Sequence, residues 1–171
     1  MLTLAVSACL LGLPTRYDGT GRPEESIVSL QTAHRLLAFC PECGCMLGVP
    51  RPKIHLGLRG NAIRLIRESD GTDLTEVMEL FAVNEIKRLL LSGVTGFIVK
   101  SRSPSCGISD TPLAGGEPGG GLFVRKLLEI VPDIPVIDET NWRITEQREQ
   151  FLNFAETWQF CGNNHEKTCK N

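Results

Sequence analysis

The sequence predicts an α/β fold. Short apolar segments of strand length alternate with longer segments in which apolar residues recur at helical spacing, and three βα units follow one another along the chain. No internal repeat, linker or low-complexity tract divides the 171 residues. Consecutive βα units form a parallel sheet covered by helices, so we expect a three-layer Rossmann-like sandwich with a mostly parallel sheet of about four strands. One domain is expected over residues 1–160, followed by a polar C-terminal tail over residues 161–171.

The first elements are expected to be strand, helix and strand. Residues 2–8 are an apolar run of strand length, and the turn-rich segment GLPTRYDGTGRP follows as a loop. A helix is predicted from Glu24 to about Arg35, and residues 37–39 form a second buried strand. The helix is indicated by apolar residues near helical spacing at Ile27, Leu30, Ala33 and Leu36.

A hairpin and a long helix are expected in the middle of the chain. The segments HLGL and AIRLI, separated by residues 59–61, pair as a small hairpin. Asp73 then caps a helix that ends near Gly93, with Glu76 three residues after the cap as in a capping box. The buried stripe of this helix is predicted to contain Val77, Leu80, Phe81, Val83, Ile86, Leu89 and Leu90.

The last part of the chain continues the alternation. The segment GFIVK is a third strand, and a glycine-rich loop over residues 115–121 precedes a helix that runs to about Ile130. Residues 135–137 form a fourth short strand. Thr145 then caps a last helix, whose buried face is predicted to include Phe151, Leu152, Ala155 and Trp158.

Composition excludes some classes of function. A formal net charge of -2 gives no general attraction to nucleic acid or to an anionic membrane. The apolar N-terminus, MLTLAVSACLLG, lacks the basic leader of a secretory signal, and no segment approaches the ~18 to 20 apolar residues of a membrane span. We therefore expect a cytoplasmic protein that does not bind membranes.

The seven cysteines are the main functional signal. In a reducing compartment they are poor candidates for structural disulfides, and an odd number cannot pair completely within the chain. Cys9, Cys40 and Cys106 each follow a predicted strand, and the carboxyl ends of parallel strands line a common crevice. The sequence therefore predicts a metal or cluster site at that edge, since thiolates prefer zinc, copper(I) or iron–sulfur clusters.

The spacing of the cysteines leaves the metal open. CPECGC adds Cys43 and Cys45 beside Cys40 and is also compatible with a zinc knuckle. A knuckle needs a second pair of ligands, which the polar tail offers in Cys161, His165 and Cys169. The same tail is equally compatible with an unstructured end.

Several polar residues are weaker candidates, and each has a structural alternative. Glu42 is the nearest carboxylate for proton transfer, or else a solvated loop acid. The loop KSRSPSCG offers hydroxyls to a cluster or substrate, or else is an ordinary turn. The run GEPGGGL resembles a phosphate-binding loop but lacks the established patterns. Structural roles are favoured for Asp18, which suits an Asx turn, and for His34 and His55.

Several motifs together resemble one protein family. SACLLG with RYDG, CPE followed by GVPRP, GTDLTE, KSRSPSCG and the late glycine-rich helix start occur in the order found in a bacterial family long catalogued as a domain of unknown function. Its studied members are thiouracil desulfidases. The resemblance covers about residues 3 to 140, which is nearly the whole predicted domain.

The resemblance implies a cofactor and a set of site residues. In this family three cysteines bind a [4Fe-4S] cluster and leave one iron free to take the sulfur of a thiolated uracil. The matching ligands here are Cys9, Cys40 and Cys106, with Glu42 as the proton-transfer residue and Ser101 or Ser103 as a hydroxyl that orients substrate or water. The extra Cys43 and Cys45 depart from many relatives, so Cys45 is an alternative to Cys40, and a fourth cysteine is a candidate to close the open iron.

The expected function is therefore non-redox removal of sulfur from a thiolated pyrimidine, a small-molecule substrate, with release of sulfide. Two alternatives remain: a zinc-stabilised binding module, and a desulfidase that acts on thiolated tRNA. For the latter, a local basic mouth formed by Arg16, Arg51, Lys100 and Arg102 would receive a phosphate. The sequence does not distinguish free base, nucleotide and tRNA, and it indicates no oligomeric state.

Overall fold

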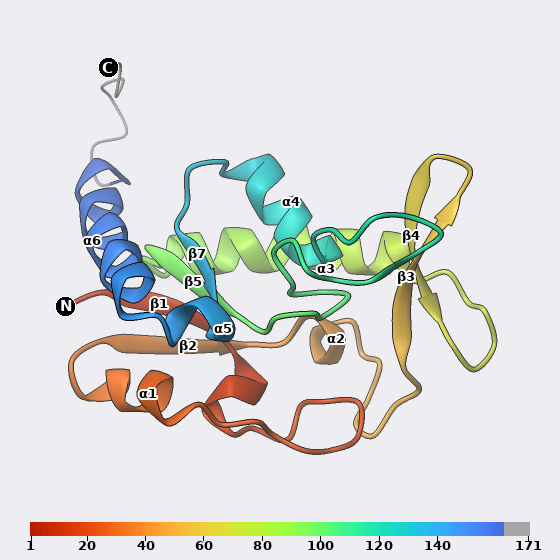
Figure 1. The fold of residues 1–171 in the computed structure, drawn as a ribbon, viewed down its shortest axis with the longest axis horizontal. Helices are drawn as coiled ribbons and strands as arrows, with labels where there is room; N and C mark the ends of the chain where they lie inside the picture. Colours follow the sequence, from red (N-terminus) through yellow and green to blue (C-terminus); the bar gives the residue numbers. More distant parts are fainter. Residues whose placement is uncertain (163–171) are drawn as a thin grey trace.

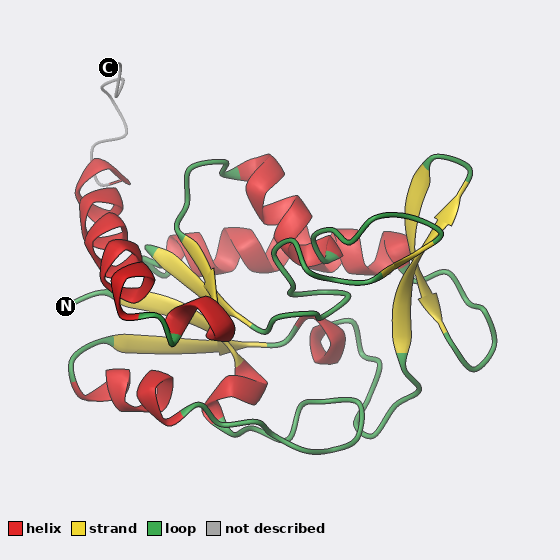
Figure 2. Cartoon of the chain, in the orientation of Figure 1, coloured by secondary structure: helices red, strands yellow, loops and turns green. Residues whose placement is uncertain are grey.

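A computed structural model describes residues 1–162 and has a central sheet of four parallel strands (Figures 1 and 2). The strand order is β2-β1-β5-β7. The strands are β1 (Thr3–Ser7), β2 (Arg35–Phe39), β5 (Gly96–Val99) and β7 (Val136–Asp138). The predicted α/β class and the mostly parallel sheet are confirmed.

Helices cover both faces of this sheet because its central strands are apolar on both sides. On one face Ala5 and Phe97 pack against α3 (Thr75–Leu91) and α4 (Leu122–Ile130). On the other face the neighbouring residues Leu4 and Ile98 pack against three helices. These are α1 (Glu25–Val28), α5 (Glu139–Trp142) and α6 (Thr145–Gly162), the last with Phe151 and Ala155 buried as predicted. The result is the predicted three-layer sandwich (Figure 1).

The helix expected from Glu24 to about Arg35 is shorter than predicted. It consists of α1 and a 3₁₀ turn, η2 (Ser29–Thr32), and β2 already begins at Arg35. The hydroxyls of Ser29 and Thr32 each donate to the carbonyl three residues earlier, at 3.1 and 2.9 Å. Such local bonds compete with a regular helix, which explains the early end.

Helix α3 begins near the predicted position but buries a different face. Its N-cap is Leu74, without a side-chain cap, so the predicted Asp73 cap and capping box are wrong. The Asp73 carboxylate accepts hydrogen bonds from the backbone and hydroxyl of Thr75, at 3.0 and 2.6 Å. Met78 and Ala82 are buried, and the predicted stripe is wrong at three positions, which are exposed: Val77, Leu80 and Val83. Apolar residues occur on nearly every side of α3, so the sequence period alone does not select the face that meets the sheet.

A second, three-stranded sheet stands at the end of the molecule away from α6 (Figure 2). The predicted hairpin is confirmed as antiparallel β3 (Ile54–Arg59) and β4 (Ala62–Arg67). A short strand that was not predicted, β6 (Leu113–Ala114), pairs in parallel with β3. Leu56 and Leu65 pack with Met78 of α3, which joins this sheet to the main body. Within residues 1–162, no helix combines the length and apolar character needed to cross a membrane.

The connections of the main sheet leave one edge suited to a site. The chain passes from β1 to β2 on one side, and then returns to β5 on the other side of β1. In parallel sheets a crevice forms at such a reversal, outside the carboxyl ends of the two diverging strands. The loops that follow β1, β2 and β5 therefore meet at this edge.

Candidate functional site

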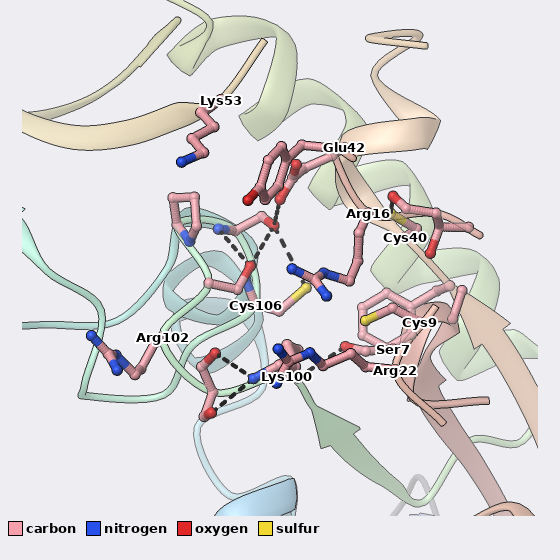
Figure 3. A pocket seen from close by; sticks show the side chains of 18 of the residues that line it. Ser7, Cys9, Arg16, Arg22, Cys40, Glu42, Lys53, Lys100, Arg102 and Cys106 are labelled. Carbon is pink, nitrogen blue, oxygen red and sulfur yellow. Dashed lines mark hydrogen bonds between the residues drawn. The ribbon is translucent and has the colours of Figure 1, made fainter. Parts of the chain in front are cut away.

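A pocket of about 690 Å³ lies at this edge, and Cys9, Cys40 and Cys106 all line it (Figure 3). Cys9 follows β1 in the 3₁₀ turn η1 (Ala8–Leu11), Cys40 follows β2, and Cys106 lies in the loop after β5. The predicted convergence of these three thiols on one pocket is therefore observed.

The backbone around Cys9 and Cys40 fixes both residues. The carbonyl of Cys9 accepts hydrogen bonds from the amides of Gly12 and Arg22, at 3.2 and 2.7 Å. Cys40 precedes the one-turn helix α2 (Pro41–Gly44), and its carbonyl accepts from the Gly44 amide at 2.9 Å. Pro41 at the first helical position fixes φ and gives up an amide that would have no partner there. Local chain geometry thus holds both cysteines at the ends of their strands.

Helix α4 holds the loop that carries Cys106. Its first amides donate to loop carbonyls: Leu122 to Pro104 at 3.0 Å and Phe123 to Ser105 at 3.0 Å. Gly121 makes this contact close, because a Cβ there would lie 2.5 Å from the carbonyl carbon of Ser105. The GEPGGGL segment therefore packs against the cysteine loop, and the N-terminal amides of α4 that a phosphate would need are already used by protein carbonyls.

Burial makes the three thiols hard to ionise. It raises the pKa of Cys9 and raises that of Cys106 to about 12. Burial also raises the pKa of Cys40 far above its usual range, and the charge of Cys106 adds to this effect. Ionisation of one thiol thus makes ionisation of its neighbour less favourable, and a nearby metal cation would stabilise the thiolates together.

The other cysteines of CPECGC lie outside the pocket lining. Cys45 is turned toward α3, where its sulfur is 3.7 Å from the carbonyl of Val77 and 3.8 Å from the sulfur of Met78. The Cys43 thiol donates to the carbonyl of Thr15 at 3.6 Å. The geometry thus favours Cys40 over Cys45 as the pocket cysteine. The side chains of the tail candidates lie outside the described residues: Cys161, His165 and Cys169.

Glu42 is the carboxylate of the pocket, and both of its oxygens are held. Oε2 accepts from Nε and Nη2 of Arg51 at 3.0 and 2.7 Å, and Arg51 is itself only 8% exposed. Oε1 accepts from the hydroxyl of Ser105 at 2.9 Å. The Ser103 hydroxyl lies 3.1 Å from that of Ser105 and accepts from the amide of Cys106 at 3.1 Å. These contacts form a continuous network from the carboxylate to the cysteine loop.

The predicted serines have different surroundings. Ser101 lines the pocket, but its hydroxyl donates to buried Glu139 at 2.7 Å, and its amide donates to the same carboxylate at 2.7 Å. Lys100 forms an ion pair with Glu139 and also donates to the Ser101 hydroxyl at 3.0 Å. Despite burial, these contacts keep the pKa of Glu139 below its ordinary value.

Sequence reasoning missed two of these residues. Ser105 contacts Glu42 directly, yet it is one of three serines in KSRSPSCG that are equivalent by type. Glu139 lies at the end of β7, beside the same sheet edge as Lys100. Its position after a predicted strand is the signal that would have identified it.

The pocket is strongly cationic. The four cations of the predicted basic mouth all line it: Arg16, Arg51, Lys100 and Arg102. Arg22 and Lys53 line it as well. Arg51 and Lys100 pair with buried carboxylates, and Arg16 pairs with Asp18 at 3.2 Å. Among the described residues, no carboxylate lies within ion-pair distance of the three remaining cations, Arg22, Lys53 and Arg102. The pocket therefore carries positive charge that is available to an anion.

The three residues expected to be structural, Asp18, His34 and His55, are not part of the pocket lining. Asp18 forms the predicted Asx turn, because its carboxylate accepts from the amide of Thr20 at 3.0 Å. His34 accepts a hydrogen bond from the amide of Leu2 at 3.3 Å, and His55 lies in the hairpin. Neither histidine lines the pocket.

Comparisons with known proteins agree with this picture. A family model described as 2-thiouracil desulfurase matches residues 4–139. The protein named "Uncharacterized protein YbbK" of Bacillus subtilis (strain 168) is 30% identical over 109 residues, which are 61% of this chain and 72% of the relative. A solved structure of the [4Fe-4S]-dependent thiouracil desulfidase TudS is 32% identical, with a TM-score of 0.67, over 82% of this chain and 93% of that one.

Proposed function

The chain belongs to the 2-thiouracil desulfurase family, and from this we propose that it removes the sulfur of a thiolated uracil, giving uracil and sulfide without net redox change. The cofactor would be a [4Fe-4S] cluster, as in the similar structure of TudS. The reducing interior of the cytoplasm is where we expect it to act. The observation that carries the proposal is the meeting of three strand-end thiols, a held carboxylate and free cations in one pocket.

The donor set fits such a cofactor. Cys9, Cys40 and Cys106 line the same pocket. Their thiolates are soft ligands, which suit iron–sulfur clusters. Within the described residues, no three Cys, His, Asp or Glu side chains lie close enough to hold a single metal ion. When bound, the cluster supplies a soft iron with a vacant coordination position, which attracts a thione sulfur more than a carbonyl oxygen.

Glu42 is the proposed general base. Arg51 neutralises and orients Oε2 through two hydrogen bonds, whereas Oε1 is held only by the Ser105 hydroxyl. Oε1 is therefore the atom that would take the proton of a water adding to the ring carbon that carries sulfur. The same oxygen then returns this proton to the leaving sulfur as the C–S bond breaks, and the second water proton leaves the added oxygen as the uracil carbonyl forms. The Ser103–Ser105 pair keeps the carboxylate aimed at the pocket during both steps.

The free cations indicate a nucleotide rather than a free base. Arg22, Lys53 and Arg102 line the pocket that also holds the thiols (Figure 3). A neutral thiouracil would leave these charges unused, whereas a phosphate group on the ribose would pair with them. Thiolated tRNA is the remaining alternative, and the net charge of -2 counts against it.

An anaerobic assay tests the proposal. The reconstituted protein is given 4-thiouracil, 4-thiouridine, 4-thiouridine monophosphate and thiolated tRNA, and sulfide and the desulfurated product are measured. We expect turnover, with kcat/KM highest for the monophosphate. A protein with a full complement of cluster that is inert toward all four substrates would refute the proposed function. A higher kcat/KM for the uncharged base would refute the proposal that the substrate is a nucleotide.

A substitution at Lys53 tests the phosphate contact in the same assay. Replacing Lys53 by Gln removes one of the free cations without touching a cysteine or Glu42. We expect KM for the monophosphate to rise about tenfold while the constants for 4-thiouracil stay unchanged. Lys87→Gln, on the exposed side of α3, is the matched control and should leave both substrates unaffected.

A further inference from the structure

Cys40 and Cys43 form a dithiol of which the proposed function uses only Cys40, as a cluster ligand. They are three residues apart, with Cys40 just before the single turn of α2 and Cys43 within it. Both thiols donate to the same acceptor, the carbonyl oxygen of Thr15, at 3.8 and 3.6 Å. Cysteines in a Cys-X-X-Cys turn of this kind are suited to closing a disulfide, because one turn brings their side chains onto the same face.

The two thiols differ in their access to the pocket. Cys40 is part of the pocket lining, whereas Cys43 is not. The Cys43 sulfur instead accepts a hydrogen bond from Nη1 of Arg51 at 3.8 Å. A small oxidant that enters the pocket therefore meets Cys40 first and leaves Cys43 as the second thiol to react.

We propose that Cys43 is a resolving cysteine, which forms a reversible disulfide with Cys40 when the cluster is absent and a peroxide enters the pocket. The inference rests on the proposed function only in assigning Cys40 as a cluster ligand. In the loaded protein Cys40 is bound to iron and Cys43 stays reduced. In the metal-free protein Cys40 has lost this protection.

The reaction balances with hydrogen peroxide as the oxidant. The Cys40 thiolate attacks one peroxide oxygen, the O–O bond breaks, and the released hydroxide takes up the thiol proton, so that Cys40 sulfenic acid and one water form. Burial raises the pKa of Cys40, so this first step is slow and needs a large excess of peroxide. The Cys43 sulfur then attacks the Cys40 sulfur, the S–O bond breaks, and the hydroxyl leaves with a proton as a second water. Two thiols are oxidised to one disulfide while one peroxide is reduced to two waters. Without Cys43, a second peroxide would convert the sulfenic acid to sulfinic acid, which thiols do not reduce.

The first test maps the oxidation products of the metal-free protein. Wild type, Cys43→Ser and Cys45→Ser are exposed to hydrogen peroxide, alkylated, digested and analysed by mass spectrometry. We expect a Cys40–Cys43 disulfide in wild type and in Cys45→Ser, and sulfinic acid at Cys40 in Cys43→Ser. Cys45→Ser is the matched control, because its sulfur faces α3 from the same short segment.

The second test measures recovery. The peroxide-treated proteins are incubated with a thiol reductant and reconstituted anaerobically. Wild type and Cys45→Ser should then bind iron again, whereas Cys43→Ser should bind little iron. Unoxidised Cys43→Ser should bind as much iron as wild type, which excludes a folding defect.

Two results would overturn the proposal. One is equal sulfinic acid at Cys40 in wild type and Cys43→Ser, and the other is a wild-type disulfide that joins Cys40 to Cys9 or Cys106. Neither readout needs substrate. A protein that forms the Cys40–Cys43 disulfide but does not desulfurate thiouracil would therefore defeat the proposed function alone.

Discussion

Glu42 shows how neighbouring side chains assign a role to one residue. A carboxylate in a short loop is by type either a solvated acid or a base, and the contacts decide between these roles. Here a buried guanidinium holds one oxygen and a buried hydroxyl holds the other. A carboxylate held in this way keeps one orientation toward the pocket, as a general base requires.

Replacing Glu42 by Gln should lower kcat for desulfuration by about 10² to 10⁴, because Gln keeps the size of the side chain and cannot take the proton. Iron content should not change, since Glu42 is not a ligand in this account. Ser105→Ala, which removes the bond to Oε1 together with the hydroxyl contacts to Ser103 and to the Cys106 sulfur, should lower kcat by about tenfold. Steady-state kinetics with iron-normalised protein measures both, and a Glu42→Gln enzyme with full activity would exclude the assigned base.

Part of the composition of this pocket could be predicted from residue types in the sequence. The three pocket cysteines and Glu42 could be predicted, because each follows a recognisable strand and the chemistry of its side chain is distinctive. The choice of serine could not. Ser101 and Ser105 have the same side chain in the same loop, and only the folded path turns one toward Glu139 and the other toward Glu42.

Helix α4 connects the core to the site through its N-terminus. Its first amides bind the carbonyls of Pro104 and Ser105, and the preceding glycine allows the two backbones to touch. The glycine-rich loop thus holds the loop that carries Cys106.

Gly121→Ala should destabilise the protein by about 1–3 kcal/mol, because the added Cβ would lie 2.5 Å from the Ser105 carbonyl carbon. The iron content should fall as well, since the Cys106 loop must shift. Gly119→Ala is the matched control in the same loop, where the nearest atom to a new Cβ is 4.0 Å away. Chemical denaturation and iron analysis distinguish them, and equal stability of the two variants would contradict the close packing.

The orientation of α3 is the part of the fold that the sequence predicted least well. Leu80 and Ala82 are both apolar and close in the sequence, yet Leu80 is 68% exposed and Ala82 is fully buried. Only contact with the sheet and with α4 decides which of the two faces is covered.

Leu80→Lys should therefore change the free energy of unfolding by no more than about 0.5 kcal/mol. Ala82→Lys places a charge in the core and should destabilise the protein by about 3 kcal/mol or more. Urea denaturation measures both values. A Leu80→Lys variant that is destabilised as strongly as Ala82→Lys would show that the sequence-predicted stripe is the buried one.

The arrangement of the molecule follows from its sheet. Four parallel strands end at one edge, and each contributes to the same region: Cys9 from β1, Cys40 from β2, Lys100 and Cys106 from β5, and Glu139 from β7. The alternation of elements predicts this edge, because parallel strands must end together. The second sheet is less predictable, since β6 is only two residues long and acquires its partner from a distant hairpin.

The pair of Lys100 and Glu139 links two of these strands and makes stability depend on pH. The folded protein lowers the pKa of Glu139, so this carboxylate stabilises the fold above the ordinary pKa of a glutamate, and the contribution is lost as pH falls through the lowered value. Wild type should thus exceed Glu139→Gln in stability at pH 7, and the gap should narrow between about pH 5 and pH 3.

Denaturation midpoints across this range check the prediction. Glu156→Gln, which removes an exposed carboxylate on α6, is the control and should leave no such gap. A difference between wild type and Glu139→Gln that stays constant from pH 7 to about pH 3 would show that the ion pair is not the cause.

The most direct test of the whole account is the iron and acid-labile sulfide content of the anaerobically purified protein. We expect about four irons and as many sulfides per chain, with loss of both in Cys9→Ser, Cys40→Ser and Cys106→Ser and retention in Cys45→Ser. Zinc without sulfide in the wild type, or full cluster content in any of the three pocket variants, would contradict it.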